Sequence, residues 1–253
     1  MPTVFITGGG GTTGPGLIRA FSAAGYDVVA SYHRSKDRTE AALQAAREAH
    51  GVRTLALQGD NGRVEDILAM FRTVEETFGG IDCMVNNAGV TFGTDFLNAT
   101  EKDFDHGIQV DFRGTFFCMQ QAAKNMITHG IKGVIINISS NHQTITFHGT
   151  MLYAACKAAV DRMTKTASIE LAPYGIRVVD IAPGYVQVPD FGKAHTGEDW
   201  YEHIVSKIPL GRYAVNDEIG KAAVFLASPD AAIITGTSLY MDGGAQNVTG
   251  VPG

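Results

Sequence analysis

Short runs of β-branched and other apolar residues alternate along the chain with longer segments in which apolar residues recur every three or four positions. The short runs are typical of buried strands, and the longer segments are typical of helices. Because helices separate the strands, we expect an α/β fold with one doubly wound, seven-stranded parallel sheet and helices on both faces. The predicted strands are Thr3 to Thr7, Asp27 to Tyr32, Thr54 to Gln58, Ile81 to Asn86, Gly133 to Ile138, Arg177 to Ile181 and Ser238 to Met241.

The segment from Met151 to Leu171 has the most regular helical pattern. Its apolar residues form a stripe that should face the sheet. Tyr153 and Lys157 are four positions apart on this helix and therefore share a face. A nearby ammonium favours the ionised phenol, so such a pair can exchange a proton near neutral pH. By itself, however, the spacing is more typical of a partly buried tyrosine beside a solvated lysine.

The stretch from Val188 to Leu210 interrupts the alternation and shows no steady period. Long irregular segments in compact domains often carry function. We therefore predict a substrate loop here, and an ordinary surface connection is the alternative.

Composition and charge narrow the class of protein. The 253 residues, of which 45% are hydrophobic and 18% charged, can bury a large core as one domain spanning residues 1–253. The net charge of −6 disfavours a nucleic-acid partner. The N-terminus lacks a signal-peptide pattern and no apolar run is long enough for a bilayer, so we expect a cytoplasmic protein without membrane contact.

Cysteine and histidine spacing gives no sign of redox or metal chemistry. Cys83, Cys118 and Cys156 are far apart in apolar segments, as is typical of buried, reduced thiols. The eight histidines include no pair with the spacing of a zinc site, so we expect no metal.

A glycine-rich loop follows the first predicted strand. It reads Thr7-Gly8-Gly9-Gly10-Gly11-Thr12-Thr13-Gly14, and a helix should begin near Pro15. A strand, a glycine loop and a helix N-terminus together form a site for pyrophosphate, because bare backbone N–H groups and the helix dipole face the phosphates. A turn without a ligand would need only one or two glycines.

Further motifs follow the later strands in register. They are Asn86-Asn87-Ala88-Gly89 after the fourth strand, Ser139-Ser140 after the fifth, Tyr153 with Lys157, and Pro183-Gly184 after the sixth. With Thr7-Gly8 and Gly14, this series resembles the short-chain dehydrogenase/reductase family from Val4 to Gly244. The resemblance implies a single Rossmann domain, an oxidoreductase that moves a hydride between a nicotinamide and a small-molecule ketone or secondary alcohol, and a homotetramer or homodimer.

The resemblance also implies roles for individual residues. Tyr153 would be the general acid in reduction and the general base in oxidation. Lys157 would hold the nicotinamide ribose and favour the ionised tyrosine, and Ser140 would hydrogen-bond the substrate oxygen. Cofactor contacts, besides Tyr153 and Lys157, would come from Gly8, Thr12, Thr13, Gly14, His33, Arg34, Ser35, Asp60, Asn61, Asn87, Ala88, Gly89, Pro183, Gly184, Val186 and Val188.

The end of the second strand favours NADP(H) over NAD(H). An NAD enzyme generally places a carboxylate there, whereas this chain has Tyr32. His33, Arg34 and Ser35 come next, with Lys36 and Arg38 soon after, and can bind a 2′-phosphate. A solvated helix start explains the last two equally well, and NAD(H) remains the alternative.

Three positions depart from the family pattern. Thr12 stands where the loop usually has glycine or alanine, Val188 where a threonine often bonds the nicotinamide carboxamide, and Asp111 where the catalytic tetrad has asparagine. Asp111 would either be ionised close to Lys157, or be protonated or face away. Ser140, Tyr153 and Lys157 are intact, so we expect an active enzyme; a non-catalytic nucleotide-sensing protein is the alternative.

The expected substrate wall is partly aromatic and partly polar, which suits a cyclic or aromatic carbonyl compound. Its residues are Ser140, Asn141, His142, Gln143, Phe147, His148, Tyr185, Phe191 and Trp200.

Overall fold

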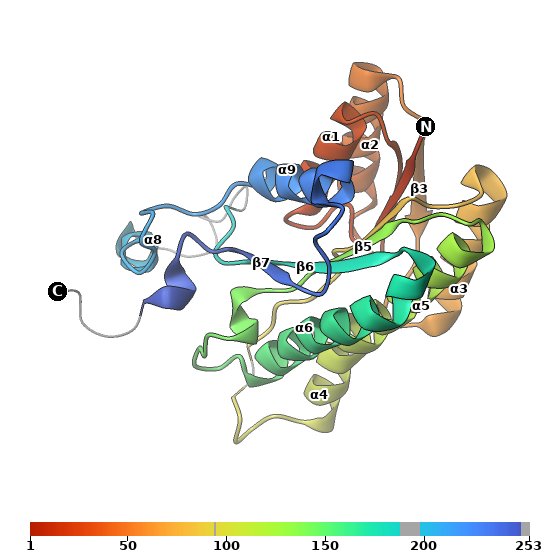
Figure 1. The fold of residues 1–253 in the computed structure, drawn as a ribbon. Helices are drawn as coiled ribbons and strands as arrows, with labels where there is room; N and C mark the ends of the chain where they lie inside the picture. The colour runs from red at the N-terminus through yellow and green to blue at the C-terminus, as the bar shows by residue number, and fades with distance from the viewer. Residues whose placement is uncertain (94, 188–197, 249–253) are drawn as a thin grey trace.

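Seven parallel strands form one sheet in the order β3-β2-β1-β4-β5-β6-β7 (Figure 1). The computed structural model describes residues 1–93, 95–187 and 198–248. The predicted doubly wound sheet is confirmed, with strand bounds that differ from the prediction by at most two residues. The strands are β1 (Thr3–Ile6), β2 (Asp27–Tyr32), β3 (Thr54–Gln58), β4 (Cys83–Asn86), β5 (Val134–Ile138), β6 (Arg177–Pro183) and β7 (Ser238–Met241).

Helices cover both faces of the sheet (Figure 1). One face packs against α1 (Gly14–Ala23), α2 (Lys36–His50) and α9 (Asn216–Ala227), and the other against α3 (Val64–Phe78), α5 (Thr115–Thr128) and α6 (Met151–Leu171). Each face has its own apolar cluster. Because side chains on both faces of a strand are buried, strands such as β1 are continuous apolar runs rather than alternating ones.

Shorter elements complete the chain. The π-helical segment η1 (Ile108–Gly114) joins α4 (Glu101–Gly107) to α5. Within the predicted substrate loop, residues 188–197 lie outside the described part, and helix α8 (Glu198–Val205) occupies part of the rest. The 3-10 turns are η2 (Asn141–Gln143), η3 (Ala172–Tyr174), η4 (Pro229–Ala231) and η5 (Ala245–Asn247).

Helix α6 buries a polar line beside its apolar stripe. Cys156 and Val160 of the predicted stripe are buried, but so are Tyr153, Lys157 and Thr164. The Thr164 hydroxyl accepts a hydrogen bond of 2.8 Å from the Asn137 side chain on β5. Thus α6 contacts the sheet through polar as well as apolar groups, which the apolar period alone did not predict.

Strand order places a crevice at one point of the sheet edge. β1 pairs with β2 on one side and with β4 on the other, so the sheet grows in opposite directions from β1 and β4. The loops after these two strands therefore separate, and ligands of open α/β sheets bind at such a switch point.

The described residues contain no helix that is long and apolar enough to cross a membrane. They also contain no group of three His, Cys, Asp or Glu side chains placed to hold a metal ion. The three cysteines are free and buried. Burial raises the pKa of the Cys118 thiol to about 12 and that of Cys156 to about 11, the latter with a smaller contribution from Asp111. These thiols are therefore protonated near neutral pH.

Candidate active site

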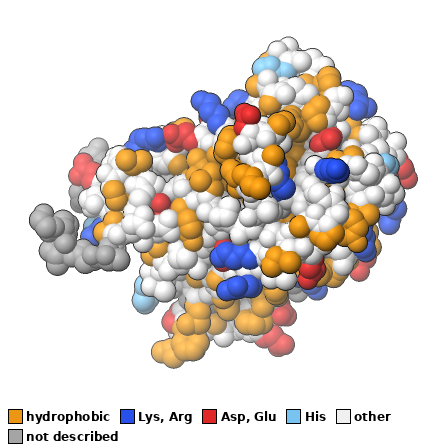
Figure 2. Space-filling model, in the orientation of Figure 1, with side chains coloured by type: hydrophobic (Ala, Val, Ile, Leu, Met, Phe, Trp, Pro, Cys, Tyr) orange, Lys and Arg blue, Asp and Glu red, His pale blue; other side chains and the backbone are white. Residues whose placement is uncertain are grey.

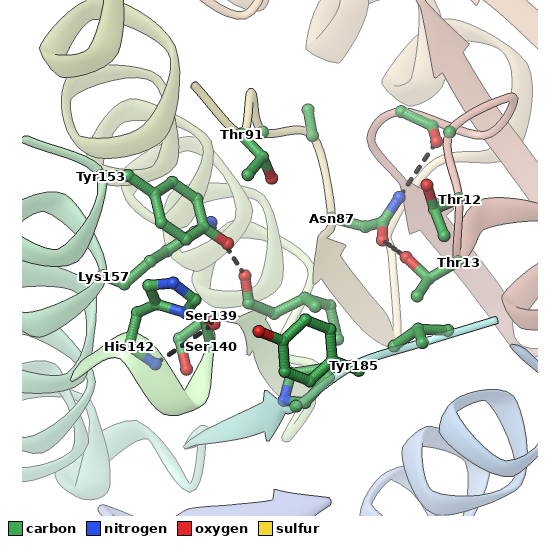
Figure 3. A pocket seen from close by; sticks show the side chains of 18 residues that line it. Thr12, Thr13, Asn87, Thr91, Ser139, Ser140, His142, Tyr153, Lys157 and Tyr185 are labelled. Carbon is green, nitrogen blue, oxygen red and sulfur yellow. Dashed lines mark hydrogen bonds between the residues drawn. The ribbon is translucent and has the colours of Figure 1, made fainter. Parts of the chain in front are cut away.

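The loops after β1 and β4 are bound to each other by hydrogen bonds. The Thr7 hydroxyl accepts hydrogen bonds of 3.0 Å from the backbone N–H groups of Asn87 and Ala88. The Asn87 amide donates to the carbonyls of Thr7 and Gly8, both at 3.0 Å, and its oxygen accepts from the Thr13 hydroxyl (Figure 3). The protein's own groups thus fix the shape of the crevice.

Helix α1 begins directly against the glycine loop. A Cβ on Gly14 would lie 2.3 Å from the carbonyl oxygen of Gly9, so only glycine permits this approach. The side chain of Thr13, the residue that caps α1, makes no capping hydrogen bond and contacts Asn87 instead. The first N–H groups of α1 can therefore serve an anion, as the sequence predicts.

Two adjoining hollows, of about 370 and 420 Å³, lie along this crevice and share Gly8, Gly11, Ala88 and Gly89. Of the residues predicted to contact the cofactor, Gly14 lines neither hollow because it supports the loop from behind, and Val188 lies outside the described residues. The first hollow is lined by Gly8, Thr12, Thr13, Asn87, Ala88, Gly89, Tyr153, Lys157, Pro183, Gly184 and Val186. The second is lined by His33, Arg34, Ser35, Asp60 and Asn61. A continuous, two-part hollow fits an extended dinucleotide.

The second hollow presents basic and hydroxyl groups at the end of β2. Arg34 is exposed and makes no ion pair with any described residue. Ser35 precedes α2 and makes no side-chain capping hydrogen bond. Asp60 lies 4.0 Å from His33 Nε2 and also accepts a 2.8 Å hydrogen bond from the Gly62 N–H, so it closes a turn while it lines the hollow.

Tyr153, Lys157 and Ser140 lie together on one wall of the first hollow, opposite Thr12, Thr13 and Asn87 (Figure 3). Lys157 Nζ lies 5.4 Å from the centre of the Tyr153 ring and donates to the Ile138 carbonyl at 3.4 Å. The Tyr153 hydroxyl makes no hydrogen bond to the described residues and is therefore available to a ligand.

Asp111 forms a buried ion pair with Lys157. Its Oδ1 lies 2.9 Å from Lys157 Nζ, and its Oδ2 accepts a 3.1 Å hydrogen bond from the Val90 N–H. Burial is the largest single influence and lowers the pKa of Lys157, but the charges of Asp111 and Tyr153 and the hydrogen bond to Asp111 together raise it by more. The net pKa therefore lies above its ordinary value, and the side chain is an ammonium ion. Asp111 reaches this position from η1, and wide π-helical turns often occur at functional sites.

The Lys157–Asp111 ion pair lies against the backbone of Gly89, so this position has room only for glycine. A Cβ at this position would come within 2.6 Å of Asp111 Oδ1 and 3.2 Å of Lys157 Nζ. The last residue of the Asn86-Asn87-Ala88-Gly89 motif is thus explained by a contact between charged side chains and backbone.

Ser140 is paired with His142, a contact that the sequence analysis did not predict. Ser140 Oγ lies 3.1 Å from His142 Nδ1 and accepts a 3.3 Å hydrogen bond from the His142 N–H. The imidazole stacks on the Phe147 ring, with 4.2 Å between the ring centres, and meets the Tyr153 ring edge-on, with 5.1 Å between the centres. Burial, followed by the charge of Lys157, lowers the pKa of His142 to about 4. The imidazole is therefore neutral near neutral pH.

Aromatic side chains continue from His142 along the predicted substrate side. The ring centres of Phe147 and Tyr185 are 6.4 Å apart, and Tyr185 lines the first hollow. Tyr185 in turn stacks on Tyr213, with 5.4 Å between the ring centres. Tyr201 of α8 lies 4.9 Å from Tyr213. Tyr213 was not among the expected substrate residues, because nothing in the sequence links it to the motifs.

Six expected substrate residues do not line the hollow or cannot be placed in it. Gln143 donates a 2.9 Å hydrogen bond to the Tyr240 hydroxyl, and Phe147 stacks on His142 without lining the hollow itself. Asn141 is buried beside Gly184 because the η2 turn directs it inward, and His148 is exposed to solvent. Phe191 lies outside the described residues, and Trp200 belongs to α8 but its side chain is not described. Conversely, Thr91 lines the hollow and was not predicted; its place just after the Asn86-Asn87-Ala88-Gly89 motif could have indicated it.

Comparisons with known proteins agree with this geometry. A family model described as Enoyl-(Acyl carrier protein) reductase matches residues 13–246. The chain is 34% identical to 3beta-hydroxysteroid dehydrogenase 1 of Eggerthella lenta over 96% of its length and 92% of that protein. It is 33% identical to the 3-oxoacyl-(acyl-carrier-protein) reductase FabG of Staphylococcus aureus, over 96% of this chain and 97% of that one.

Solved structures show the same likeness in three dimensions. A short-chain dehydrogenase from Bacillus anthracis is 34% identical, with a TM-score of 0.88 over 99% of this chain and 98% of the other. A gluconate 5-dehydrogenase from Burkholderia cenocepacia, solved with NADP and tartrate, is 29% identical, with a TM-score of 0.89 over 98% and 96% of the two chains. Motifs, fold and relatives over nearly the whole length therefore show that the chain belongs to the short-chain dehydrogenase/reductase family of oxidoreductases.

Proposed function

We propose that the protein is an NADP(H)-dependent oxidoreductase that interconverts a ketone and a secondary alcohol, with Tyr153 as the proton donor and acceptor. The observation that carries this proposal is the position of Tyr153. Its hydroxyl, which makes no hydrogen bond to the described residues, shares a hollow with the glycine loop and lies beside the Lys157 ammonium ion, which is paired with Asp111.

Each residue of the wall has a defined task in this reaction. The bound nicotinamide supplies or accepts the hydride. Tyr153 donates a proton to the carbonyl oxygen during reduction and removes it during oxidation. Ser140 hydrogen-bonds the same oxygen, and the Lys157 ammonium stabilises the phenolate that remains after proton donation.

The preference for NADP(H) is supported by the second hollow. A 2′-phosphate there would meet Arg34, His33 and the hydroxyl of Ser35, at the N-terminus of the 15-residue helix α2. Tyr32 supplies no carboxylate to repel it. The relative from Burkholderia cenocepacia was solved with NADP, which is consistent with this choice.

The substrate is proposed to be a neutral, ring-bearing ketone or alcohol. Among the described residues that line the first hollow, the charged side chain is Lys157, which Asp111 neutralises. The neutral His142 and the Tyr185 ring line the hollow, and Phe147 packs against both of them, so the substrate side is mainly aromatic and suits a ring. A relative is named as a hydroxysteroid dehydrogenase, which also favours a cyclic substrate. No observation favours a non-catalytic sensor.

A cytoplasmic homotetramer or homodimer, organised as one domain, is also part of the proposal. Helices α5 and α6 carry exposed apolar side chains, among them Phe116, Ile127 and Ile169. Hydrophobic side chains are visible on the surface over this part of the molecule (Figure 2). A second copy of the chain packed on this face would bury them.

Tyr153→Phe should abolish turnover, because it removes the dissociable proton but keeps the ring. We expect kcat to fall about a hundredfold to ten-thousandfold in NADPH-dependent ketone reduction. Cofactor affinity, measured by fluorescence titration, should stay within about twofold. Tyr174→Phe, at a surface site on η3, is the matched control and should keep full activity. More than about a tenth of wild-type kcat in Tyr153→Phe would refute the acid/base assignment.

Arg34→Ala should weaken the enzyme selectively toward NADP(H). Loss of a charge-assisted hydrogen bond costs roughly 1.5–3 kcal/mol, so kcat/KM for NADPH should fall about 10- to 100-fold. The value for NADH should change little. Arg38→Ala, on the exposed face of α2 and outside the hollow, is the control. A wild-type preference for NADH would contradict the proposed cofactor.

Neutral ring ketones should be better substrates than charged ones. We expect kcat/KM for cyclohexanone, 1-decalone or acetophenone to exceed that for acetoacetyl-coenzyme A and 5-ketogluconate at least about tenfold, because no free cation of the described lining compensates a charge. Tyr185→Leu should lower the ring-ketone values more than the value for acetone. A preference for either charged compound would exclude the neutral-ring assignment.

Asp111→Asn should move alcohol oxidation to lower pH. The carboxylate offsets the field of Lys157 at Tyr153, so its removal favours the phenolate that oxidation requires. A unit charge at this range should shift the pH–rate profile downward by roughly half a unit to two units. Activity should be retained or improved.

Asp105→Asn on α4, which is exposed, is the matched control for Asp111→Asn. Thermal unfolding of both variants checks that the fold is intact. An unchanged profile in Asp111→Asn would remove the electrostatic role, and complete loss of activity would mean that the carboxylate itself carries a proton-transfer step.

A further inference from the structure

The Ser140 hydroxyl has an unusual set of neighbours for a group that must donate to a substrate. Its oxygen accepts from the His142 N–H at 3.3 Å and lies 3.1 Å from His142 Nδ1. The remaining neighbour within reach is Asn141 Oδ1 at 3.5 Å, the longest of the three contacts. The direction of the hydroxyl proton therefore depends mainly on His142.

A neutral imidazole has one N–H group, which is on either Nδ1 or Nε2. If the proton is on Nε2, Nδ1 is an acceptor and the Ser140 hydroxyl points its proton at His142, away from the substrate. If the proton is on Nδ1, the imidazole donates to Ser140 Oγ. In that case the hydroxyl proton is free to point into the hollow.

We propose that His142 is a positioning residue which, as the Nδ1–H tautomer, donates to Ser140 Oγ and so directs the Ser140 hydroxyl proton at the substrate oxygen. This inference rests on the proposed function, because it assigns a donor role to Ser140. The ring is held for the task by its stack on Phe147 at 4.2 Å and its edge contact with Tyr153 at 5.1 Å.

The pairing makes Ser140 a donor only. A hydroxyl oxygen accepts two hydrogen bonds, and the backbone N–H and Nδ1–H of His142 occupy both. Ser140 can then donate to a carbonyl oxygen, but it cannot accept from an alcohol O–H. The alcohol must direct its proton elsewhere, which leaves the Tyr153 phenolate as its acceptor, and the resting site binds the ketone better than the alcohol.

Three substitutions separate this role from simple packing. The amide nitrogen of asparagine can replace Nδ1, whereas that of glutamine lies farther out, at the position of Nε2. With cyclohexanone and NADPH, His142→Leu should lower kcat/KM about 3- to 30-fold, in the range of one hydrogen bond. His142→Asn should recover most of this loss, and His142→Gln should not.

The ratio of ketone to alcohol recognition provides a second readout. In His142→Leu, Ser140 regains a free acceptor, so KM for cyclohexanol should fall relative to KM for cyclohexanone. His50→Leu, at the exposed end of α2 and outside both hollows, should change neither quantity. Equal or better rescue by glutamine, or an unaltered kcat/KM in His142→Leu, would overturn the proposal.

The tautomer can be measured without turnover. Nitrogen-15 NMR of histidine-labelled protein distinguishes Nδ1–H from Nε2–H by the ring shifts, and the His142→Asn spectrum assigns the signal. We expect the Nδ1–H form at pH 7; the Nε2–H form would refute the inference even if ketone reduction is confirmed. Conversely, the Nδ1–H form in a wild-type protein that reduces no ketone would leave the positioning geometry intact and refute the proposed function.

Discussion

The buried ammonium of Lys157 imposes the constraint on which the wall formed by Ser140, Tyr153 and Lys157 depends. A charged amine removed from water destabilises the fold unless a counter-charge meets it, and Asp111 does so at 2.9 Å. This one contact binds α6 to the π-helical segment η1. It also excludes any side chain at Gly89, whose backbone lies against both charges. The relative positions of three segments thus follow from one ion pair.

The loop after β4 transmits this constraint to the cofactor side. At its start, Asn87 and Ala88 are joined to Thr7 of the glycine loop by hydrogen bonds of 3.0 Å. Three residues later, the Val90 N–H donates to Asp111. The same short segment therefore contacts both the glycine loop and, through Asp111, the wall that carries Tyr153 and Lys157. Hydride transfer requires a fixed position of the cofactor relative to the substrate-binding wall. The four backbone residues from Asn87 to Val90 connect the two.

Sequence patterns predicted the strands well because strands buried on both faces are continuous apolar runs. They placed the start of β4 two residues early. The Ile81 N–H donates to the Asn125 side chain rather than to a neighbouring strand, and Asp82, whose backbone bonds to Thr3 and Val134, lies just before the strand begins. Helix α8, with eight residues, is too short to show a period. The motifs identified most residues of the hollows. They could not reveal the contact of His142 with Ser140, which depends on the η2 turn.

Asp111 and His142 act on different groups, yet both favour proton donation from the wall. When Asp111 is ionised, the Lys157–Asp111 pair has no net charge. A protonated Tyr153 phenol keeps the buried wall neutral, whereas a phenolate would add a negative charge that no described neighbour compensates. As the proposed Nδ1–H tautomer, the neutral His142 occupies the acceptor positions of Ser140 and leaves the hydroxyl proton of Ser140 for the ligand. Two donors then face a ligand oxygen that can only accept. A carbonyl oxygen can accept from both donors. An alcohol oxygen can also accept, but its own proton is left without an acceptor, so under the proposed function the resting site favours the ketone.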